Sequence, residues 1–392
     1  MPGKIKASLN ERLRNVKWGE YELGKLFDIE NTLSFNADKL VDGTEYDYVT
    51  RTSINQGILQ STGFVNKENI NPAGTWSLGL LSMDFFYRKK PWYAGQFVRK
   101  IIPLIDIPPK AVLFFSTILN NQKTALLSVL VRNVDSTFRK LKVKLPVAVT
   151  GEIDFDFMET FISDLEAERI STLSTFLKAS SLDNCELSAA EVDAIDRLRA
   201  VQWHEYRIGE LLTKIETKKL PYQAKDLPDS PIGQYVLPCL TSSFQNQGLN
   251  YYAPRDGATI LKNVISIPSN SDVYRAYFQS REFTVLSDAY AVKWKHENRE
   301  LTQRQYLFVV MCINKVTDLS IYSHKNKLGG WNTVKDKWIH LPQKNGKIDF
   351  DFMDALISAI QKLVIKDVVL YKNQKELDIG SRGKFIIPDD TM

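Results

Sequence analysis

The chain has 392 residues, of which 44% are hydrophobic and 25% charged, the composition of a folded protein with two or three domains. It contains no run of about eighteen apolar residues, and its basic N-terminal stretch lacks the apolar core of a secretory signal. Its three cysteines are scattered and form no CxxC pair. We therefore expect a cytoplasmic protein, and not a membrane-spanning protein, a secreted disulfide-rich protein or a zinc ribbon.

The formal net charge of +5 is too small to mark a nucleic-acid-binding protein by charge alone. Lysine and arginine are nevertheless concentrated in three stretches, at residues 88–90, 214–219 and 324–337. Acidic residues gather elsewhere, for example at 181–196. Such segregation is typical of a surface that faces a polyanion, although an ordinary solvated surface explains it equally well.

Each half of the chain opens with the same tryptophan-centred pattern. Residues 13–27 read LRNVKWGEYELGKLF and residues 198–212 read LRAVQWHEYRIGELL, so that both follow LRxVxWxEYxxGxL. A capping-box pattern precedes each, SLNE at 8–11 and SAAE at 188–191, which predicts a short helix. Repetition of this kind indicates a duplicated structural unit.

The middle of each half carries short β-branched or aromatic runs separated by turn residues, which predict β-strands. Both halves also place Thr, Ser and an Asn-Gln-Gly turn in the same order, in YVTRTSINQGI from Tyr48 and PCLTSSFQNQGL from Pro238. We expect two β-rich globular units with strands at residues 97–105, 110–115, 126–131 and 140–146 of the first and 263–268, 290–295 and 306–313 of the second.

The hexamer IDFDFM occurs twice, at residues 153–158 and 348–353. After each copy the apolar residues recur about every 3.6 positions, which predicts amphipathic helices, the first from about Asp154 to Lys178. We expect Asp154 and Asp349 to cap the two helices and the hexamer phenylalanines to pack onto the preceding domain.

The apolar stripes of the two helices are assigned to helix packing or to a partner protein. Their members are Met158, Ile162, Leu165, Leu173, Met353, Ile357 and Ile360. The β-branched residues beyond about Lys366 leave a strand open as an alternative to the end of the second helix. The fold class is thus α+β, with two duplicated β-rich units separated and followed by long helices.

No catalytic or metal-binding constellation is recognisable in the sequence. The four histidines do not pair as HxxxH or HxH, no cysteine has a histidine partner in a familiar spacing, and no glycine-rich phosphate loop occurs. We therefore expect no catalytic residue, no metal site and no cofactor in this chain. The pattern is typical of a recognition or scaffold protein, and an enzyme with a cryptic site is a third hypothesis.

Polar and basic loops in both units offer side chains suited to DNA. Arginine pairs with guanine and Asn or Gln with adenine, while Ser, Thr and Lys hold phosphates. An ordinary surface turn is the alternative interpretation of each residue. The candidate DNA-binding residues are Arg51, Thr52, Ser53, Asn55, Gln56, Tyr87, Arg88, Lys89, Lys90, Thr241, Ser242, Gln245, Asn246, Gln247, Arg275, Lys325 and Lys327.

Together, WGEYELGKLF, YVTRTSINQGI, SMDFFYRKKPWYAGQ and KIDFDFM resemble the specificity (S) subunits of type I restriction–modification systems and the related type IIB specificity subunits. The resemblance covers about residues 13–378, in two copies. It implies two target recognition domains, each reading half of a bipartite double-stranded DNA site, and long helices packed together as an antiparallel spacer. It also implies methyltransferase subunits, and in the full complex a restriction subunit, as partners that bind S-adenosylmethionine, ATP and magnesium.

These observations divide the chain into a first target recognition domain (1–152), a spacer helix (153–180), a linker with a second target recognition domain (181–347), and a second spacer helix with a tail (348–392). The function that follows is a non-catalytic DNA sequence-recognition subunit, which positions methyltransferase and restriction subunits. A tandem protein-interaction scaffold without DNA specificity is the alternative. The short ending SRGKFIIPDDTM leaves the subtype open.

Overall fold

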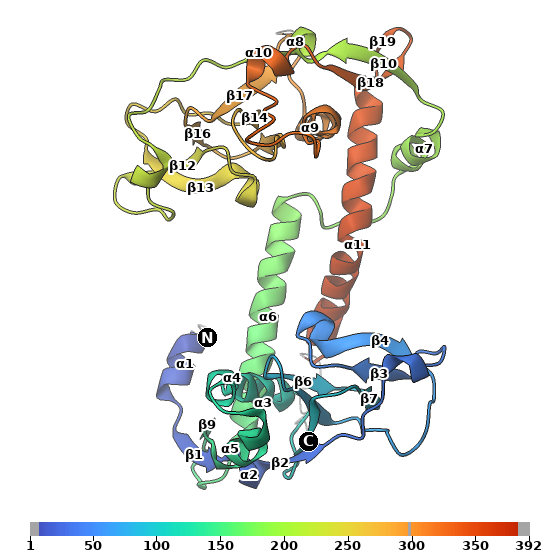
Figure 1. Cartoon of the computed structure of the whole chain (residues 1–392), viewed down its shortest axis with the longest axis vertical. Helices are drawn as coiled ribbons and strands as arrows, with labels where there is room; N and C mark the ends of the chain where they lie inside the picture. Colours follow the sequence, from blue (N-terminus) through green and yellow to red (C-terminus); the bar gives the residue numbers. More distant parts are fainter. Residues whose placement is uncertain (1–7, 297–298, 383–392) are drawn as a thin grey trace, which may run out of the picture. The chain divides into compact units, whose positions relative to one another are not determined.

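The structure, a computed structural model, describes residues 8–296 and 299–382. It divides into two compact units, one formed by residues up to Leu173 together with those from Ile379 onward and the other by Ser174–Asp378 (Figure 1). Both units combine small β-sheets with helices in a closely similar order, as the repeated sequence predicts. The division into four segments drawn from the sequence stays a prediction.

The first unit contains three sheets, with strand orders β2-β8-β5-β6, β4-β3-β7 and β1-β9. Its elements are α1 (Leu9–Asn15), β1 (Trp18–Glu22), α2 (Leu23–Leu26), β2 (Phe27–Asn31), β3 (Tyr46–Val49), β4 (Ile58–Thr62), β5 (Thr75–Gly79), β6 (Asp84–Arg88), β7 (Trp92–Ala94), β8 (Val98–Pro103), α3 (Ala111–Asn120), α4 (Lys123–Leu127), α5 (Val134–Lys140) and β9 (Lys142–Pro146). The long helix α6 (Phe155–Ala179) follows.

The second unit repeats this plan with strand orders β11-β17-β14-β15, β13-β12-β16 and β10-β18-β19. Its elements are α7 (Ala189–Arg197), β10 (Gln202–Arg207), α8 (Ile208–Leu211), β11 (Leu212–Lys214), β12 (Tyr235–Leu240), β13 (Leu249–Pro254), β14 (Val264–Pro268), β15 (Tyr277–Gln279), β16 (Thr284–Val285), β17 (Ala289–Trp294), α9 (Gln303–Thr317), α10 (Trp331–Val334), β18 (Trp338–Lys344), β19 (Lys347–Ile348) and α11 (Phe350–Arg382).

Each unit has its own hydrophobic core between the four-stranded sheet and the helices that follow it. In the first unit Phe27 packs edge-on against Trp76, with ring centroids 5.5 Å apart, and against Phe115 of α3. In the second, Ile265 of β14 and Ile313 of α9 are completely buried in one cluster. The two units are therefore supported by separate cores.

The strand predictions were right for residues 97–105, 140–146, 263–268 and 290–295, which contain β8, β9, β14 and β17. Three predictions were wrong, because residues 110–115 and 126–131 fall largely in α3 and α4 and their adjoining turns, and 306–313 lies in α9. A short apolar run that is buried on several sides looks alike in a strand and in a core helix, so its composition alone did not distinguish them.

Both capping predictions for the hexamers are confirmed. The Asp154 carboxylate accepts a hydrogen bond from the backbone N–H of Phe157 at 2.8 Å, and Asp349 does the same for Phe352 at 3.0 Å. Phe157 packs against the core of the first unit and Phe352 is buried in that of the second. The capping boxes expected ahead of α1 and α7 are present as well.

The long helices agree with the sequence in extent. Helix α6 ends one residue beyond the predicted end at Lys178. Helix α11 continues through the β-branched stretch to Arg382, so the strand alternative beyond Lys366 is wrong. The C-terminal tail of the predicted fourth segment lies outside the described residues from 383 onward.

The apolar stripes pack differently from what we expected. Helix α6 buries Met158 and Ile162 in the core of the first unit and lays Leu165 against it, while α11 buries Met353 and Ile357 in the core of the second. Leu173 is half-buried and Ile360 is 39% exposed. The early turns of both helices thus hold the helix to its own globular domain, and antiparallel packing of the helices along their length stays a prediction.

Candidate nucleic-acid interface

Each unit presents one tight turn at the end of a three-stranded sheet, the first turn (residues 51–57) after β3 and the second turn (residues 242–248) after β12. Residues 55–57 have φ angles of 48°, 55° and 78°, and residues 246–248 have 47°, 56° and 86°. Three consecutive left-handed residues are costly for any side chain larger than glycine. Such a backbone therefore requires support from its surroundings.

The support is the same in both units. Asn55 donates from Nδ2 to the carbonyl of Ile58 at 3.1 Å, and Asn246 donates to that of Leu249 at 2.7 Å. The backbone closes the turn from Thr50 N–H to the Gly57 carbonyl at 2.7 Å, with an equivalent bond in the second unit at 3.4 Å. Asparagine tolerates the left-handed region and bonds its own backbone, so the repeated Asn-Gln-Gly explains the shape of the turn.

The residues that differ between the turns lie next to this shared backbone and reach solvent. Ile54 is 80% exposed and Phe244 is 47% exposed. Gln245 and Arg51 are also exposed. Because the backbone is held alike in both units, the chemical difference at the tips lies in the pairs Arg51 and Ser242, Ser53 and Phe244, and Ile54 and Gln245.

The first turn borders a hollow of about 660 Å³ that is lined also by Asn36, Leu59, Leu81 and Gln96. The guanidinium of Arg51 lies over the Phe97 ring, 5.2 Å from its centroid. An exposed arginine beside apolar and amide side chains matches the groups that read base edges, since arginine pairs with guanine and apolar groups contact the thymine methyl. The sequence interpretation found Arg51 but missed Leu59, Leu81 and Phe97, whose only signal is that they are apolar residues near turns.

One acidic residue lies directly beside the first turn. Asp84 accepts hydrogen bonds from Ser53 and from the Lys123 ammonium, the latter at 2.6 Å. Burial acts to raise the pKa of Asp84, but hydrogen bonds from Lys123, Ser53 and Ser82 outweigh it and lower that pKa. The carboxylate stays charged and is paired with the Lys123 ammonium, and within residues 51–57 the exposed cation is Arg51.

The basic aromatic segment at residues 87–90 is placed less favourably than predicted. Arg88 is only 2% exposed, so its direct DNA contact is corrected to a buried role. Tyr87 is half-buried with its ring centroid 4.7 Å from that of Trp76, and Lys90 forms an ion pair with Asp47 at 2.8 Å. Lys89 is exposed. A basic run in the sequence does not show which of its side chains alternate into the core.

In the second unit the exposed predicted residues are Gln245, Asn246, Gln247, Arg275, Lys325 and Lys327, and Ser242 is half-buried. Thr241 is buried at 8% exposure and supports the turn. Arg275 forms an ion pair with Asp318 at 2.6 Å, and Asp318 raises the Arg275 pKa, so its charge is largely satisfied. In the first unit, Thr52 is half-buried and Asn55 and Gln56 are exposed.

A basic hollow of about 730 Å³ in the second unit was missed by sequence interpretation. Exposed lysines from three places meet there, Lys262 before β14, Lys293 in β17 and Lys295 after it. His296, Arg299 and one acidic residue, Glu300, also line it. Lysines gathered in this way suit phosphate oxygens. Their signal was the alternation of lysines along residues 290–295, which we used only to predict a strand.

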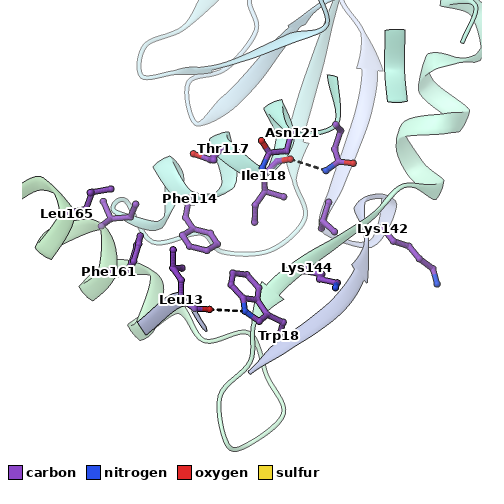
Figure 2. A pocket seen from close by; sticks show the side chains of 13 residues that line it. Leu13, Trp18, Phe114, Thr117, Ile118, Asn121, Lys142, Lys144, Phe161 and Leu165 are labelled. Carbon is purple, nitrogen blue, oxygen red and sulfur yellow. Dashed lines mark hydrogen bonds between the residues drawn. The ribbon is translucent and has the colours of Figure 1, made fainter. Parts of the chain in front are cut away.

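A different, mainly apolar groove of about 500 Å³ lies in the first unit between α1, α3, β9 and α6 (Figure 2). Trp18 stacks on Phe114 with centroids 6.4 Å apart and donates from its indole N–H to the Leu13 carbonyl at 3.3 Å. Lys142 and Lys144 are the charged residues of its lining. Such a mainly apolar lining suits contact with another molecule.

The described residues contain no group of three or more His, Cys, Asp or Glu side chains arranged to hold a metal ion. The three cysteines are unpaired, and burial raises the pKa of Cys239 and of Cys312 to about 12, which keeps both as unreactive thiols. Within residues 8–296 and 299–382 no helix has the length and apolar character required to cross a membrane.

Comparison with protein families decides what these duplicated units are. The family model described as the type I restriction modification DNA specificity domain matches residues 15–175 and again residues 200–370. The chain belongs to this family. It is a type I specificity subunit with two tandem specificity domains, and its role is recognition of a DNA target. The resemblance inferred from the sequence motifs is confirmed.

A solved structure of an S subunit supports the fold of this specificity subunit. The type I restriction–modification S subunit from M. genitalium matches over 100% of both chains, with a TM-score of 0.55 and 13% identity. The HsdS subunit from Thermoanaerobacter tengcongensis matches over 95% of this chain and 92% of that one, with 12% identity and a TM-score of 0.27. No curated protein sequence matches the chain.

Proposed function

We propose that this specificity subunit reads a bipartite DNA target, with the first turn contacting one half-site and the second turn contacting the other. The observation that carries the proposal is the pair of turns. Their backbones are held by equivalent hydrogen bonds, whereas their exposed side chains differ. A repeated backbone with different exposed side chains is suited to reading two different short DNA sequences. The shared backbone positions the side chains, and the contacts of those side chains with bases determine which sequence is bound.

The backbone phosphates of the target would be held by the exposed lysines, with Lys325 and Lys327 and the basic hollow of Lys262, Lys293 and Lys295 on the second unit. Arg51 is the best candidate for a bidentate contact with guanine, since it is exposed at the tip of the first turn. The exposed amides of Gln245 and Gln247 are suited to adenine.

We further propose that the chain is not catalytic. Methylation and cleavage would be carried out by methyltransferase and restriction subunits, which would also bind S-adenosylmethionine, ATP and magnesium. Membership of the specificity family supports this division of labour. Turnover of DNA by the isolated chain in the presence of these cofactors and the metal would contradict it.

The direct test is selection of the full-length chain on random DNA duplexes. Two short enriched blocks separated by a constant gap are expected. Binding that depends on salt and is indifferent to sequence would rule out direct readout and favour the scaffold alternative.

The spacer role of α6 has its own test. We would insert four residues after Arg169, an exposed position in the helix, which adds slightly more than one turn, or about 6 Å. The gap between the two blocks should change by about one to two base pairs at 3.4 Å per pair, while both blocks keep their sequence. A constant gap would remove the spacer role from α6.

A further inference from the structure

Each turn rests on a buried side chain from the neighbouring four-stranded sheet. In the first unit Arg88 of β6 donates from Nη2 to the Gln56 carbonyl at 2.6 Å and from Nε to Ser77 Oγ at 2.9 Å. In the second, Gln279 of β15 donates from Nε2 to the Gln247 carbonyl at 3.1 Å and to Ser266 Oγ at 3.0 Å. Both anchors are buried, at 2% and 8% exposure.

The two anchors occupy the same position of the fold. In the antiparallel pair of β5 and β6, Thr75 is opposite Arg88, and in that of β14 and β15, Val264 is opposite Gln279. The serine that accepts from each anchor stands two residues further along the first strand of each pair. Its hydroxyl donates to the carbonyl across the ladder at 3.5 Å in both units. The strand register, the accepting serine and the turn carbonyl are equivalent in the two units, so this hydrogen-bond arrangement is duplicated along with the fold.

The atom that the anchor binds is the critical one in the turn. Gln56 and Gln247 are the middle residues of the left-handed stretches, and their carbonyls face the sheet, where the anchor side chains meet them. A buried carbonyl without a donor costs about 1–3 kcal/mol, which would add to the cost of the left-handed backbone. The anchor therefore fixes the conformation that presents the tip residues.

The anchors differ in chemistry although they agree in position. Burial lowers the pKa of Arg88 to about 10, partly offset by Asp47, so the guanidinium is still charged at neutral pH. Gln279 is neutral. A hydrogen bond from a charged donor is about twice as strong as one between neutral groups. The first turn is thus held by a charged anchor and the second by a neutral one.

We infer that Arg88 and Gln279 are equivalent positioning residues for DNA recognition, which set the shape of the two reading turns from beneath without touching DNA. The inference rests on the proposed function of the turns and names the residues on which their precision depends. Each half-site then has a determinant that makes no contact with a base, and the two determinants act independently because each lies within its own unit.

Four single variants of the full-length chain test this inference. Arg88→Met and Gln279→Met keep a long side chain and remove the donor, and Arg88→Gln installs the natural anchor of the second unit. Arg51→Ser serves as the reference that identifies the half-site of the first turn. The measurements are base enrichment at each half-site in selection on random duplexes, and thermal unfolding of the same preparations.

Arg88→Met should lower discrimination at the first half-site about tenfold, the factor of one charge-assisted hydrogen bond, and leave the second half-site unchanged. Gln279→Met should lower discrimination at the second half-site by a smaller factor and leave the first half-site unchanged. Arg88→Gln should retain most of the discrimination. Equal loss at both half-sites, or an unchanged first half-site in folded Arg88→Met, overturns the inference.

Two further outcomes are separable. If Arg88→Met does not fold, Arg88→Gln and Gln279→Met still test the inference. A folded Arg88→Gln that loses its discrimination at the first half-site would show that glutamine does not replace the arginine, which contradicts the inference. If the unchanged chain shows no preferred half-sites, the proposed function itself is wrong. Loss confined to one half-site in a variant that keeps its unfolding temperature supports the positioning role, since a merely structural defect in that unit would lower this temperature.

Discussion

The two halves of the molecule keep the same frame and change the parts that reach outward. The first and second turns share their left-handed backbone and their asparagine bonds, but the tips carry Arg51 in one and Ser242 in the other. This comparison shows that the residues whose hydrogen bonds hold the turn are kept in both units, whereas the exposed residues beside them differ and are available for recognition.

The junction between each short helix and its long helix shows a second contrast. In the first unit Arg12 of α1 pairs with Asp164 of α6 at 2.5 Å, and both side chains are about a quarter exposed, at 22% and 27%. In the second, Glu191 of α7 pairs with Lys362 of α11 at 2.8 Å and also accepts from Ser358, at exposures of 7% and 17% for the ion pair. The ion pair between the short and the long helix is thus partly exposed to solvent in the first unit and largely buried in the second.

Removing the buried carboxylate should have the largest effect on folding. Glu191→Ala leaves the Lys362 ammonium largely buried without its ion pair, and we expect a loss of about 3 kcal/mol in unfolding free energy. Asp164→Ala, the matched change in the first unit, should cost less than about 1 kcal/mol because its pair is partly solvated. Denaturant unfolding of both variants measures the difference, and equal losses would contradict the contrast.

The pH dependence sharpens this prediction. Burial acts to raise the pKa of Glu191, but hydrogen bonds from Lys362, Ser358 and Ser188 lower it to about 2, from an ordinary value of 4.5. A depressed pKa adds stability that is fully present above about pH 4.5 and is lost as the pH falls toward 2. The stability difference between the unchanged chain and Glu191→Gln should therefore be constant from neutral pH to about pH 5 and shrink below it.

Alanine at the turn glycines should have the next largest effect. A Cβ on Gly57 would lie 3.1 Å from the Thr50 carbonyl, 3.2 Å from that of Thr52 and 3.4 Å from Arg88 Nη2, whereas one on Gly248 has a single contact below 3.7 Å. With φ positive at both, we expect a loss of about 2 kcal/mol for Gly57→Ala and about 1 kcal/mol for Gly248→Ala. Thermal unfolding tests the order, and a larger loss at Gly248 would refute it.

The helix cap should matter less. Asp154→Ala removes the acceptor of the Phe157 N–H and should cost about 1 kcal/mol, while Asp154→Ser should recover most of it because serine also caps. The same pair of changes at Asp349 is the comparison in the second unit. Hydrogen exchange at the first turn of α6 should rise in the alanine variant alone, and equal exchange in both variants would argue against capping by this carboxylate.

The smallest effect on folding is expected for the exchange of tips. Arg51→Ser puts the residue of the second turn into the first and removes a contact with Phe97, which should change stability by only about 0.5 kcal/mol. Base preference should nevertheless be lost at one position of one half-site. Selection on random duplexes measures this, and an unchanged preference would show that Arg51 does not read a base.

Parts of the fold were accessible from the sequence because they depend on local rules. The hexamers predicted both caps and the start of both long helices, since an aspartate before an amphipathic stretch satisfies the first free N–H groups of a helix. The apolar runs at 110–115 and 306–313 did not reveal helices, because periodicity is weak where burial surrounds an element.

The candidate site was predictable only in outline. The turns were located correctly from Asn-Gln-Gly, whereas Arg88 was assigned to the surface because it stands in a basic run. Which side of a strand faces the core is decided by pairing with the neighbouring strand, and that pairing is not visible in a single strand of the sequence.

The sequence by itself determined that the protein is a duplication, where its two long helices begin and where its two turns lie, because repetition and capping are properties of short segments. Only the tertiary structure decided that Arg88 and Gln279 are one position in two copies. Their equivalence rests on strand register and on a hydrogen bond to a carbonyl that lies 32 residues earlier in the chain in both units. Contacts of that range exist only once the chain has folded.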